Sequence, residues 1–499
     1  MVSLVAALMV LIPLGLRWRA QWSLSAYRKK LIASGEKLTV EELAPKHIPQ
    51  ATNAARFVRL ASMIKPFWQF QPSLMHFIKP GVARVTWRQP QAMMVMVSDP
   101  TKPAIDVWPL LKDALGTNQQ TMDELQALVD AGGIEFIEDY SLANIQNYNH
   151  LAGTREAITY FSARATFELH ENRRQEALAD LEFCGKVSEC VARDPIMLDQ
   201  MMFSSYLSME AKESWEALQA NGWTDGELAR LQRQWDHRDI LAPAALSLAM
   251  ERARAPMAFQ AARASRQALN GMGGDADVKN FGEIWNDFLL HASTVPNELF
   301  TTYPRYWGWR WIWSYRDEQR YMEFMQTMIS GTRDAQQRRS VLSLLRDRAE
   351  NPNLDPPIGG HFDVVAPITE STKRFIRDAL RAQTVANIVT VAIALERFRL
   401  AHHAYPAALT NLTPEFVQTV PVDCMDGHDL RYHLKPDGTY LLYSVGSDGV
   451  DNGGDATPIE GKKPGFLNGR DSVWPRAATD EEVQAYEAEQ NKPKAGGKK

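Results

Sequence analysis

The sequence predicts a mainly helical protein that ends in a small α+β domain. Through most of residues 118–350, apolar residues recur at the spacing of one helix face. Near the C-terminus, a long helical pattern is followed by two short segments of strand composition. Because 45% of the 499 residues are hydrophobic, the chain can build a packed core. We expect helical hairpins arranged as a bundle or a short solenoid, followed by one long helix and an antiparallel sheet.

Composition excludes two broad classes of protein. The chain has 55 Lys and Arg against 60 Asp and Glu, which gives a formal net charge of −5. Nucleic-acid binders usually carry a basic face and a high pI, so we expect no nucleic-acid partner. Three cysteines are too few for a disulfide framework, which excludes a small stapled secreted scaffold.

The N-terminus predicts a membrane anchor within residues 1–24. Residues 2–16 are uncharged and nearly all apolar, and as a helix they would reach about 22 Å. Trp18 and Trp22 would serve as interfacial anchors at the end of such a span. No Lys or Arg precedes the apolar run, and no small-residue cleavage site follows it, so an uncleaved anchor is preferred to a signal peptide. A buried N-terminal helix of a soluble protein is the other alternative. The basic residues after the span favour a cytoplasmic body.

Residues 25–117 read as a mixed, proline-rich region. Thr39 to Glu42 forms a capping box that predicts a short helix, and the segment through residues 53–55 reads as a linker. A strand is expected near Ala92–Ser98. Helical spacing then becomes regular from about residue 118 and stops at Gly132.

The predicted helical domain spans residues 118–350. Residues 150–182 predict a helical hairpin with a polar turn at 170–173, and a third helix follows as far as Asn221. A second capping box from Thr224 to Glu227 starts the next helix. The hairpin is only weakly similar to tetratricopeptide units, because the full repeat is absent. Glycines at 271–274 mark an expected boundary or hinge.

Tryptophans alternate through residues 303–315. Trp307 and Trp311 fit one helical face with Tyr315, and a helix after Pro304 is favoured over a strand. Such a cluster could stack on sugars or lie at a membrane surface, whereas the more ordinary interpretation is an aromatic core helix.

The C-terminal module is predicted over residues 371–475. A long helix is expected from Ser371 to about His402, followed by a hairpin of residues 430–433 and 440–445 around a Pro-Asp-Gly turn. Residues 476–499 are rich in Glu and Lys and are expected to be a disordered tail.

This module resembles the globular head of the major pseudopilin of type II secretion systems. The matching motifs keep the family's order and spacing: Ala394–Arg399, Tyr405-Pro406, Leu412, Pro421-Val422-Asp423, Asp426-Gly427, Leu430-Arg431-Tyr432 and Leu442–Gly449. The resemblance covers about 75 residues and implies an extracytoplasmic location in a bacterial envelope, against the charge argument. The helix is internal and no peptidase site precedes it, so the chain is not expected to be a processed pilus subunit.

In pseudopilins the loop after the last strand binds calcium, which implies a site here at Asp448, Asp451, Asn452 and Asp455. The chemistry agrees, because Ca²⁺ takes about 6–8 oxygen ligands and the neighbouring glycines let the backbone wrap around an ion. The competing interpretation is an Asp/Gly turn capped by its own side chains.

No catalytic motif is found. His170-Glu171 lacks the second histidine of a zinc protease motif, and neither a phosphate-binding glycine loop nor a nucleophile elbow is present. His402 and His403 are expected to complement a helix end rather than bind metal. We therefore expect a membrane-anchored envelope protein that acts by binding or assembly, with a protein partner on the helical domain. Two alternatives stay open: an enzyme, such as a hydrolase, with a site between helical units, and a soluble helical-repeat scaffold.

Overall fold

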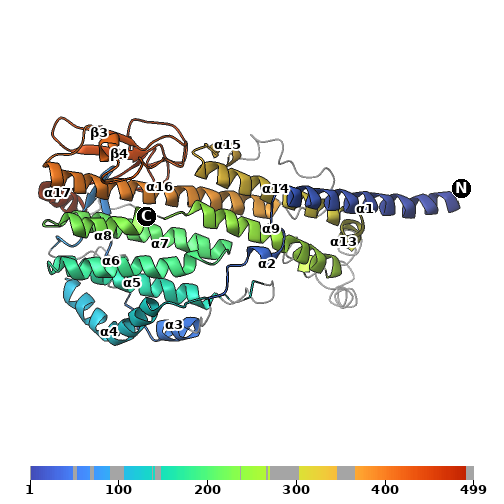
Figure 1. Cartoon of the computed structure of the whole chain (residues 1–499), viewed down its shortest axis with the longest axis horizontal. Coiled ribbons are helices and arrows are strands. Elements are labelled where there is room, and N and C mark those ends of the chain that lie inside the picture. Colours follow the sequence, from blue (N-terminus) through green and yellow to red (C-terminus); the bar gives the residue numbers. More distant parts are fainter. Residues whose placement is uncertain are drawn as a thin grey trace, which may run out of the picture.

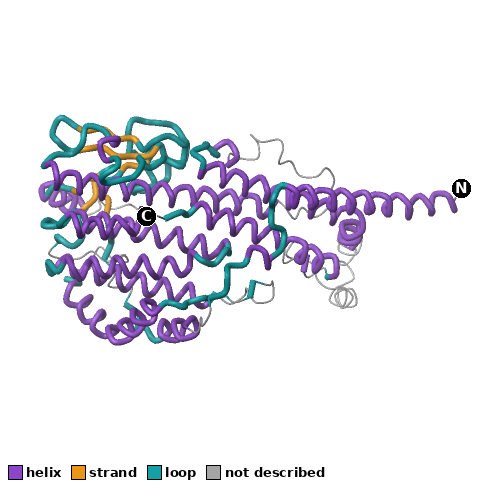
Figure 2. The backbone as a smooth tube through the Cα atoms, viewed as in Figure 1, coloured by secondary structure: helices purple, strands orange, loops and turns teal. Residues whose placement is uncertain are grey.

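The computed structural model describes residues 2–48, 53–67, 72–89, 106–137, 139–140, 148–236, 238–265, 268–269, 303–345 and 366–490. Within these ranges the chain is mainly helical, with small sheets at one end of an elongated molecule (Figures 1 and 2). This confirms a mainly helical fold with a small antiparallel sheet near the C-terminus. The strand expected near residues 92–98 and the glycine boundary at 271–274 lie outside the described residues.

Long helices form the body. Those before the tryptophan run are α1 (Val2–Ala33), α2 (Val40–Leu43), α3 (Asn53–Ser62), α4 (Trp108–Ala131), α5 (Asn149–His170), α6 (Arg174–Ala192), α7 (Met197–Leu218), α8 (Asp225–Asp236) and α9 (Leu241–Ala264). The run itself forms α13 (Tyr303–Gly308) and the π-helical η3 (Trp309–Trp313), and it is followed by α14 (Ser314–Gln336), α15 (Leu342–Leu345), α16 (Ala366–His402) and α17 (Asp480–Gln490). The hairpin of α5 and α6 is the one that the sequence predicted.

Local signals set several helix ends. Both predicted capping boxes form: the Glu42 N–H donates to Thr39 Oγ1, and the Glu227 N–H donates to Thr224 Oγ1. Gly132 ends α4 with a φ of +73°, a conformation that suits glycine. One start was expected too late, because α4 begins ten residues before 118, with Pro109 in its first turn. One helix was not expected, because α3 occupies the segment interpreted as a linker.

Helix α16 is the central element of the molecule. It packs against α7, α8, α9 and α14, and its far end carries the small sheet (Figure 1). Its side chains from Val385 to Leu395 are almost all buried in the largest core cluster. Between residues 369 and 402, the exposed positions are polar, basic or small: Glu370, Ser371, Arg374, Arg399, Ala401 and His402. The helix is therefore enclosed by the body.

The C-terminal sheet contains the predicted hairpin. Strands β3 (Arg431–Leu434) and β4 (Tyr440–Ser444) pair antiparallel around Gly438, whose φ is +80°, and β5 (Ser472–Val473) pairs with β4. The 3₁₀ helix η6 (Leu409–Leu412) connects α16 to this domain. We call residues 403–475 the head.

The expected disordered tail is structured as far as residue 490. Strand β6 (Arg476–Ala477) pairs parallel with β2 (Val82–Arg84), which pairs with β1 (His76–Lys79). Helix α17 then places Glu482 beside Lys79 and Glu487 beside the buried Arg84. The prediction was wrong here because these residues gain their partners from a segment 400 positions earlier, which charge composition cannot reveal.

Candidate functional site

The four residues predicted to bind calcium lie on one loop, but their side chains turn to separate partners. Asp448 accepts from the Val450 N–H and Asp455 accepts from the Thr457 N–H. Asp451 accepts from the Gly453 N–H and pairs with Arg431 at 3.5 Å. The Asn452 amide donates to the backbone of Val450. Among the described residues, their carboxylates do not form a group whose ligand atoms lie within 4.8 Å of one another. Calcium at this loop stays a prediction.

A fourth acidic residue, absent from that prediction, holds the loop. Asp471 is fully buried and lies immediately before β5. Its carboxylate accepts from the N–H groups of Asn452, Gly454 and Asp455, at 3.2, 2.7 and 3.0 Å. Backbone N–H groups that converge on one point favour an anion there. The loop thus wraps around a carboxylate of the same chain.

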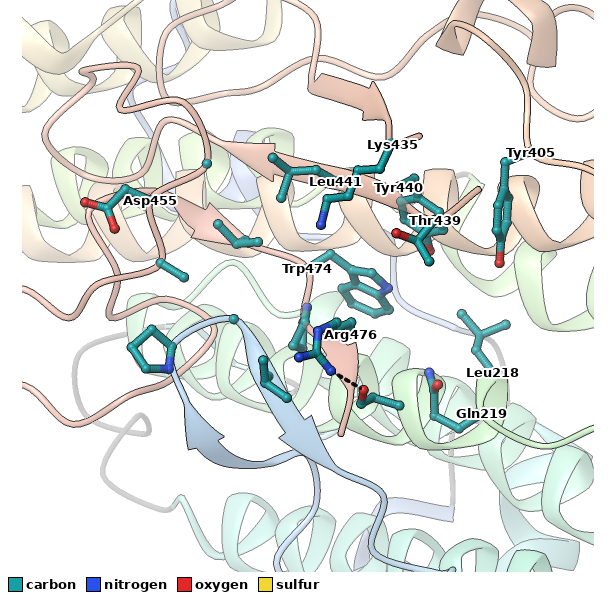
Figure 3. Close-up of a pocket in the computed structure, with 18 of the residues that line it drawn as sticks. Leu218, Gln219, Tyr405, Lys435, Thr439, Tyr440, Leu441, Asp455, Trp474 and Arg476 are labelled. Atoms are coloured by element: carbon teal, nitrogen blue, oxygen red, sulfur yellow. Dashed lines mark hydrogen bonds between the residues drawn. The ribbon is translucent and has the colours of Figure 1, made fainter. Parts of the chain in front are cut away.

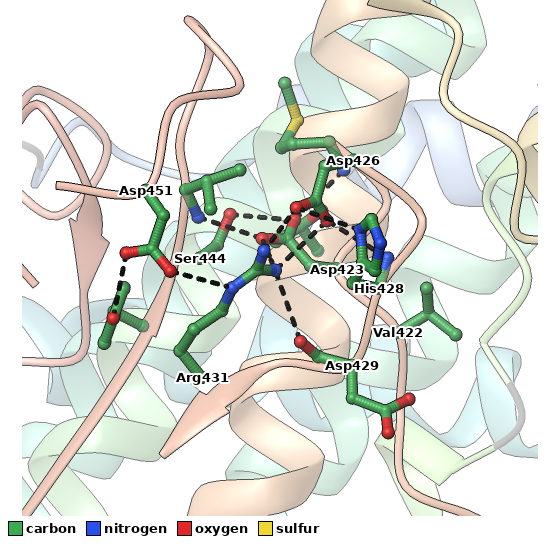
Figure 4. Close-up of polar contacts among 12 residues, drawn as sticks. Val422, Asp423, Asp426, His428, Asp429, Arg431, Ser444 and Asp451 are labelled. Carbon is green, nitrogen blue, oxygen red and sulfur yellow. Dashed lines mark hydrogen bonds and ion pairs between the residues drawn. The ribbon is translucent and has the colours of Figure 1, made fainter. Parts of the chain in front are cut away.

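Asp423 organises the other side of the head (Figure 4). It is fully buried, and its carboxylate accepts from the N–H groups of Met425 and Val445 and from Ser444 Oγ. Burial raises the pKa of this carboxyl. The hydrogen bonds from Ser444 and Val445 therefore fix the segment around Asp423 to the end of β4.

Arg431 connects three acidic side chains across this network. Its guanidinium pairs with Asp426, with Asp423 at 3.4 Å and with Asp451 at 3.5 Å (Figure 4). Burial opposes ionisation of Asp426, but the hydrogen bonds from Arg431 and the His428 N–H outweigh it, and the pKa of Asp426 is lowered. Every member has a protein partner, so this network is structural and links the predicted calcium loop to the core of the head.

A cleft of about 490 Å³ separates the head from the end of α7 and the β1–β2 turn (Figure 3). Aromatic rings from the head line part of it, with Tyr405 and Tyr440 packed edge to face at 4.8 Å. Tyr405 donates to Glu396 at 2.5 Å, and burial together with that carboxylate raises its pKa. Lys435 and Arg476 add positive charge to the lining.

The lining of this cleft suits binding. It combines apolar, aromatic and charged side chains, the mixture that recognises ligands through a few oriented polar contacts. Its described lining also includes Thr439, Glu396 and Asp455. The elements that line it, such as β4 and the end of α7, lie at the end of the molecule opposite to the N-terminus (Figure 1).

At that N-terminal end, helix α1 projects from the body (Figures 1 and 2). The large apolar side chains described on its projecting part are exposed: Leu11 by 63%, Ile12 by 56%, Leu14 by 47% and Leu16 by 46%. The side chains of residues 2–10, which belong to the predicted span, lie outside the described ones. Exposed apolar residues in such a run are typical of a surface covered by something other than water.

Aromatic and cationic side chains gather where α1 meets the body. Trp18 and Trp22 are 70% and 67% exposed, and Trp307 and Trp311 are nearly half exposed. Arg17 lies over the Trp311 ring, with its guanidinium carbon 4.9 Å from the centroid. We call these four tryptophans and Arg17 the aromatic collar. The tryptophan run is helical as expected. Trp309 is fully buried and packs in the core, whereas Trp307 and Trp311 are on the surface.

The second half of α1 is held by the body. Leu24 and Leu31 are buried against Met322 of α14. Glu318 of α14, whose side chain is 1% exposed, pairs with both Arg28 of α1 and Arg263 of α9. The projecting and docked halves belong to one continuous helix.

By length and composition, one helix with described side chains could cross a bilayer: residues Thr369–His402 of α16. Its most apolar window is 78% buried in the body, as expected for a core helix.

Sequence reasoning missed one further group. His150, Asp194 and Asp199 are all buried and converge in the body. They come from separate helices or loops, and no motif spacing relates His150 to the two aspartates. His402 and His403, which the sequence drew attention to, are exposed.

Comparisons with known proteins gave no relative. No family model, no curated protein and no solved structure matches this chain.

Proposed function

We propose that this chain is a membrane-anchored protein of the bacterial envelope that acts by binding or assembly through its pseudopilin-like head. The observation that carries the proposal is the projecting end of α1, with its exposed apolar side chains and the aromatic collar at its base. Tryptophans concentrate at membrane interfaces because their rings are apolar and their N–H is polar. Inserted in a bilayer, α1 would leave the body on one side and the cleft at its far end.

Because α16 is enclosed by the body, we infer that this protein holds the head at the membrane as a single chain and does not pack into a filament through α16. In a filament subunit, the long helix must offer an apolar face to other subunits. Here α7, α8, α9 and α14 cover that face, and the described exposed positions of α16 include no large apolar side chain. The head and its cleft are then the surfaces free to meet a partner.

A fractionation experiment tests the anchor. The full chain should remain with membranes after an alkaline carbonate wash. Leu11→Arg together with Leu14→Arg should release it, because each arginine within the apolar layer costs about 3 kcal/mol. The matched control, Leu434→Arg with Val450→Arg, changes exposed apolar residues of the head and should stay with membranes. Release of the unaltered chain by carbonate would refute the anchor.

Orientation and binding need separate readouts. A phosphatase fused to the C-terminus, active only outside the cytoplasm, should be active, and an inactive fusion would contradict the extracytoplasmic assignment.

A photo-crosslinker at Thr439 in the cleft should give a discrete protein adduct in cells, whereas one at Ile459, outside the lining, should not. Identical patterns at both positions would argue against the cleft as the binding surface.

A further inference from the structure

Three polar side chains meet inside the body, away from the cleft and from the projecting end of α1. His150 lies in the first turn of α5, Asp194 in the connection from α6 to α7, and Asp199 in the first turn of α7. They are 3%, 3% and 0% exposed. One ligand atom from each lies within 4.8 Å of the others. Among the described residues, this is the group of three His, Cys, Asp or Glu side chains that lie so close together.

Within this cluster, His150 is the basic side chain that pairs with a carboxylate, that of Asp199. Among the described residues, no Lys or Arg forms an ion pair with Asp194 or Asp199. Tyr140 donates to Asp194 Oδ1 at 2.6 Å, and His150 Nε2 lies 3.2 Å from Asp199 Oδ1. The second oxygen of each carboxylate is buried without a hydrogen-bond partner. Buried polar atoms are normally satisfied, so these two oxygens indicate a missing partner.

We propose that His150, Asp194 and Asp199 bind one divalent transition-metal ion, such as Zn²⁺, Mn²⁺ or Fe²⁺. One imidazole nitrogen and two carboxylates make a ligand set that suits these ions, whereas Ca²⁺ prefers oxygen ligands alone and in larger number. Bonds of about 2.0–2.2 Å place adjacent ligand atoms roughly 2.8–3.6 Å apart, depending on whether the angle is octahedral or tetrahedral. The hydrogen-bonded pair of His150 Nε2 and Asp199 Oδ1, at 3.2 Å, lies within that range.

The surroundings hold these ligands in place. The Phe136 ring stacks on the His150 imidazole, with centroids 4.7 Å apart. The Tyr140 hydroxyl orients Asp194, and the Gln200 amide donates to the backbone oxygens of Ala192 and Asp194. Such outer contacts fix ligand geometry in metal sites. The ion is structural: it ties the start of α5 to the start of α7 and neutralises two carboxylates in the core.

Metal binding to the full chain tests the proposal. Detergent-purified protein is stripped with a chelator and titrated with Mn²⁺, Zn²⁺ or Ca²⁺. We expect one equivalent of Mn²⁺ or Zn²⁺ to bind and to raise the Tm by about 2–3 °C at a hundredfold excess over Kd. Failure to take up Mn²⁺ and Zn²⁺, or uptake of Ca²⁺ in their place, overturns the proposal.

Two substitutions locate the ion. Asp199→Asn and His150→Gln should each weaken binding at least a hundredfold. Glu213→Gln removes another buried carboxyl of α7, outside the cluster, and should bind like the unaltered chain. Equal affinity in Asp199→Asn and the unaltered chain would place the metal elsewhere and overturn the assignment. If the variants do not fold, the visible absorption spectrum of Co²⁺ added to the unaltered chain tests the same ligand assignment. Visible d–d bands of a mixed nitrogen and oxygen site support it, and the spectrum of the aqueous ion refutes it.

Discussion

At the scale of single residues, the head depends on buried carboxylates that serve as hydrogen-bond acceptors. Asp423 and Asp471 each collect several backbone N–H groups from segments that carry no regular ladder. The N–H groups that donate to Asp423 are buried and those that donate to Asp471 are partly buried. A buried N–H left without an acceptor costs about 1–3 kcal/mol. The head is therefore a loop-rich domain stabilised by internal polar contacts.

Asp471→Ala tests this role. It removes the acceptor for three N–H groups, so we expect the unfolding free energy to fall by about 3 kcal/mol or more, measured by chemical denaturation. Asp448→Ala is the control on the same loop, because Asp448 is exposed and accepts one N–H, and it should cost less than about 1 kcal/mol. Equal losses in the two variants would contradict the central role of Asp471.

At the scale of elements, the two halves of α1 differ in what surrounds them. Its first part exposes apolar side chains, while its second part buries Leu24 and Leu31 and is fixed by charge. Glu318 is the connection, since it pairs with Arg28 on α1 and Arg263 on α9. A rigid joint at this point would hold the body at a constant distance from the membrane in the proposed arrangement.

Glu318→Ala should loosen that joint. Two guanidinium groups lose their shared carboxylate, and we expect local opening of α1 to become easier by about 2 kcal/mol. Hydrogen exchange in residues 17–33 should speed up by about thirtyfold. Asp334→Ala breaks an exposed ion pair with Arg339 at the other end of α14 and should leave that exchange unchanged. Unchanged exchange in Glu318→Ala would show that apolar packing alone holds the helix.

At the scale of the whole molecule, buried carboxyls make stability depend on pH. Burial raises the pKa of Asp180 to about 6, of Glu216 to about 7 and of Glu213 to about 8. A raised carboxyl pKa means that the folded state holds the proton more tightly than the unfolded state. The stabilisation that such a carboxyl contributes is therefore complete below its pKa in the unfolded state. It is lost as the pH rises toward its pKa in the folded state. Stability should fall between about pH 5 and pH 8.

Glu213→Gln should flatten part of that slope. Relative to the unaltered chain, the variant should gain on the order of 3 kcal/mol between pH 5 and pH 8, because the glutamine cannot ionise. Denaturation curves across this range measure the difference. Glu189→Gln, an exposed change on the neighbouring α6, should follow the pH profile of the unaltered chain. A parallel profile in Glu213→Gln would mean that Glu213 does not titrate in this range.

The fold was predictable where its cause is local. Helical spacing, the two capping boxes, Gly132 and the Pro-Asp-Gly turn act within a few residues, and each produced the expected element. The pairing of β2 with β6 and the order of α17 were not predictable, because their partners lie about 400 residues apart in the sequence. The predicted calcium ligands sit on one loop as expected, yet the acceptor that organises the loop, Asp471, follows it by about twenty residues.

The sequence by itself determined the helical class, the long helix with its hairpin, and the apolar character of the N-terminus. Periodicity and capping express backbone geometry, which each short segment carries within itself. Only the tertiary structure decided that α16 is enclosed by the body, and that His150 meets Asp194 and Asp199 in the core. Burial and the convergence of distant side chains depend on how helices pack, and packing is a property of all the surfaces together.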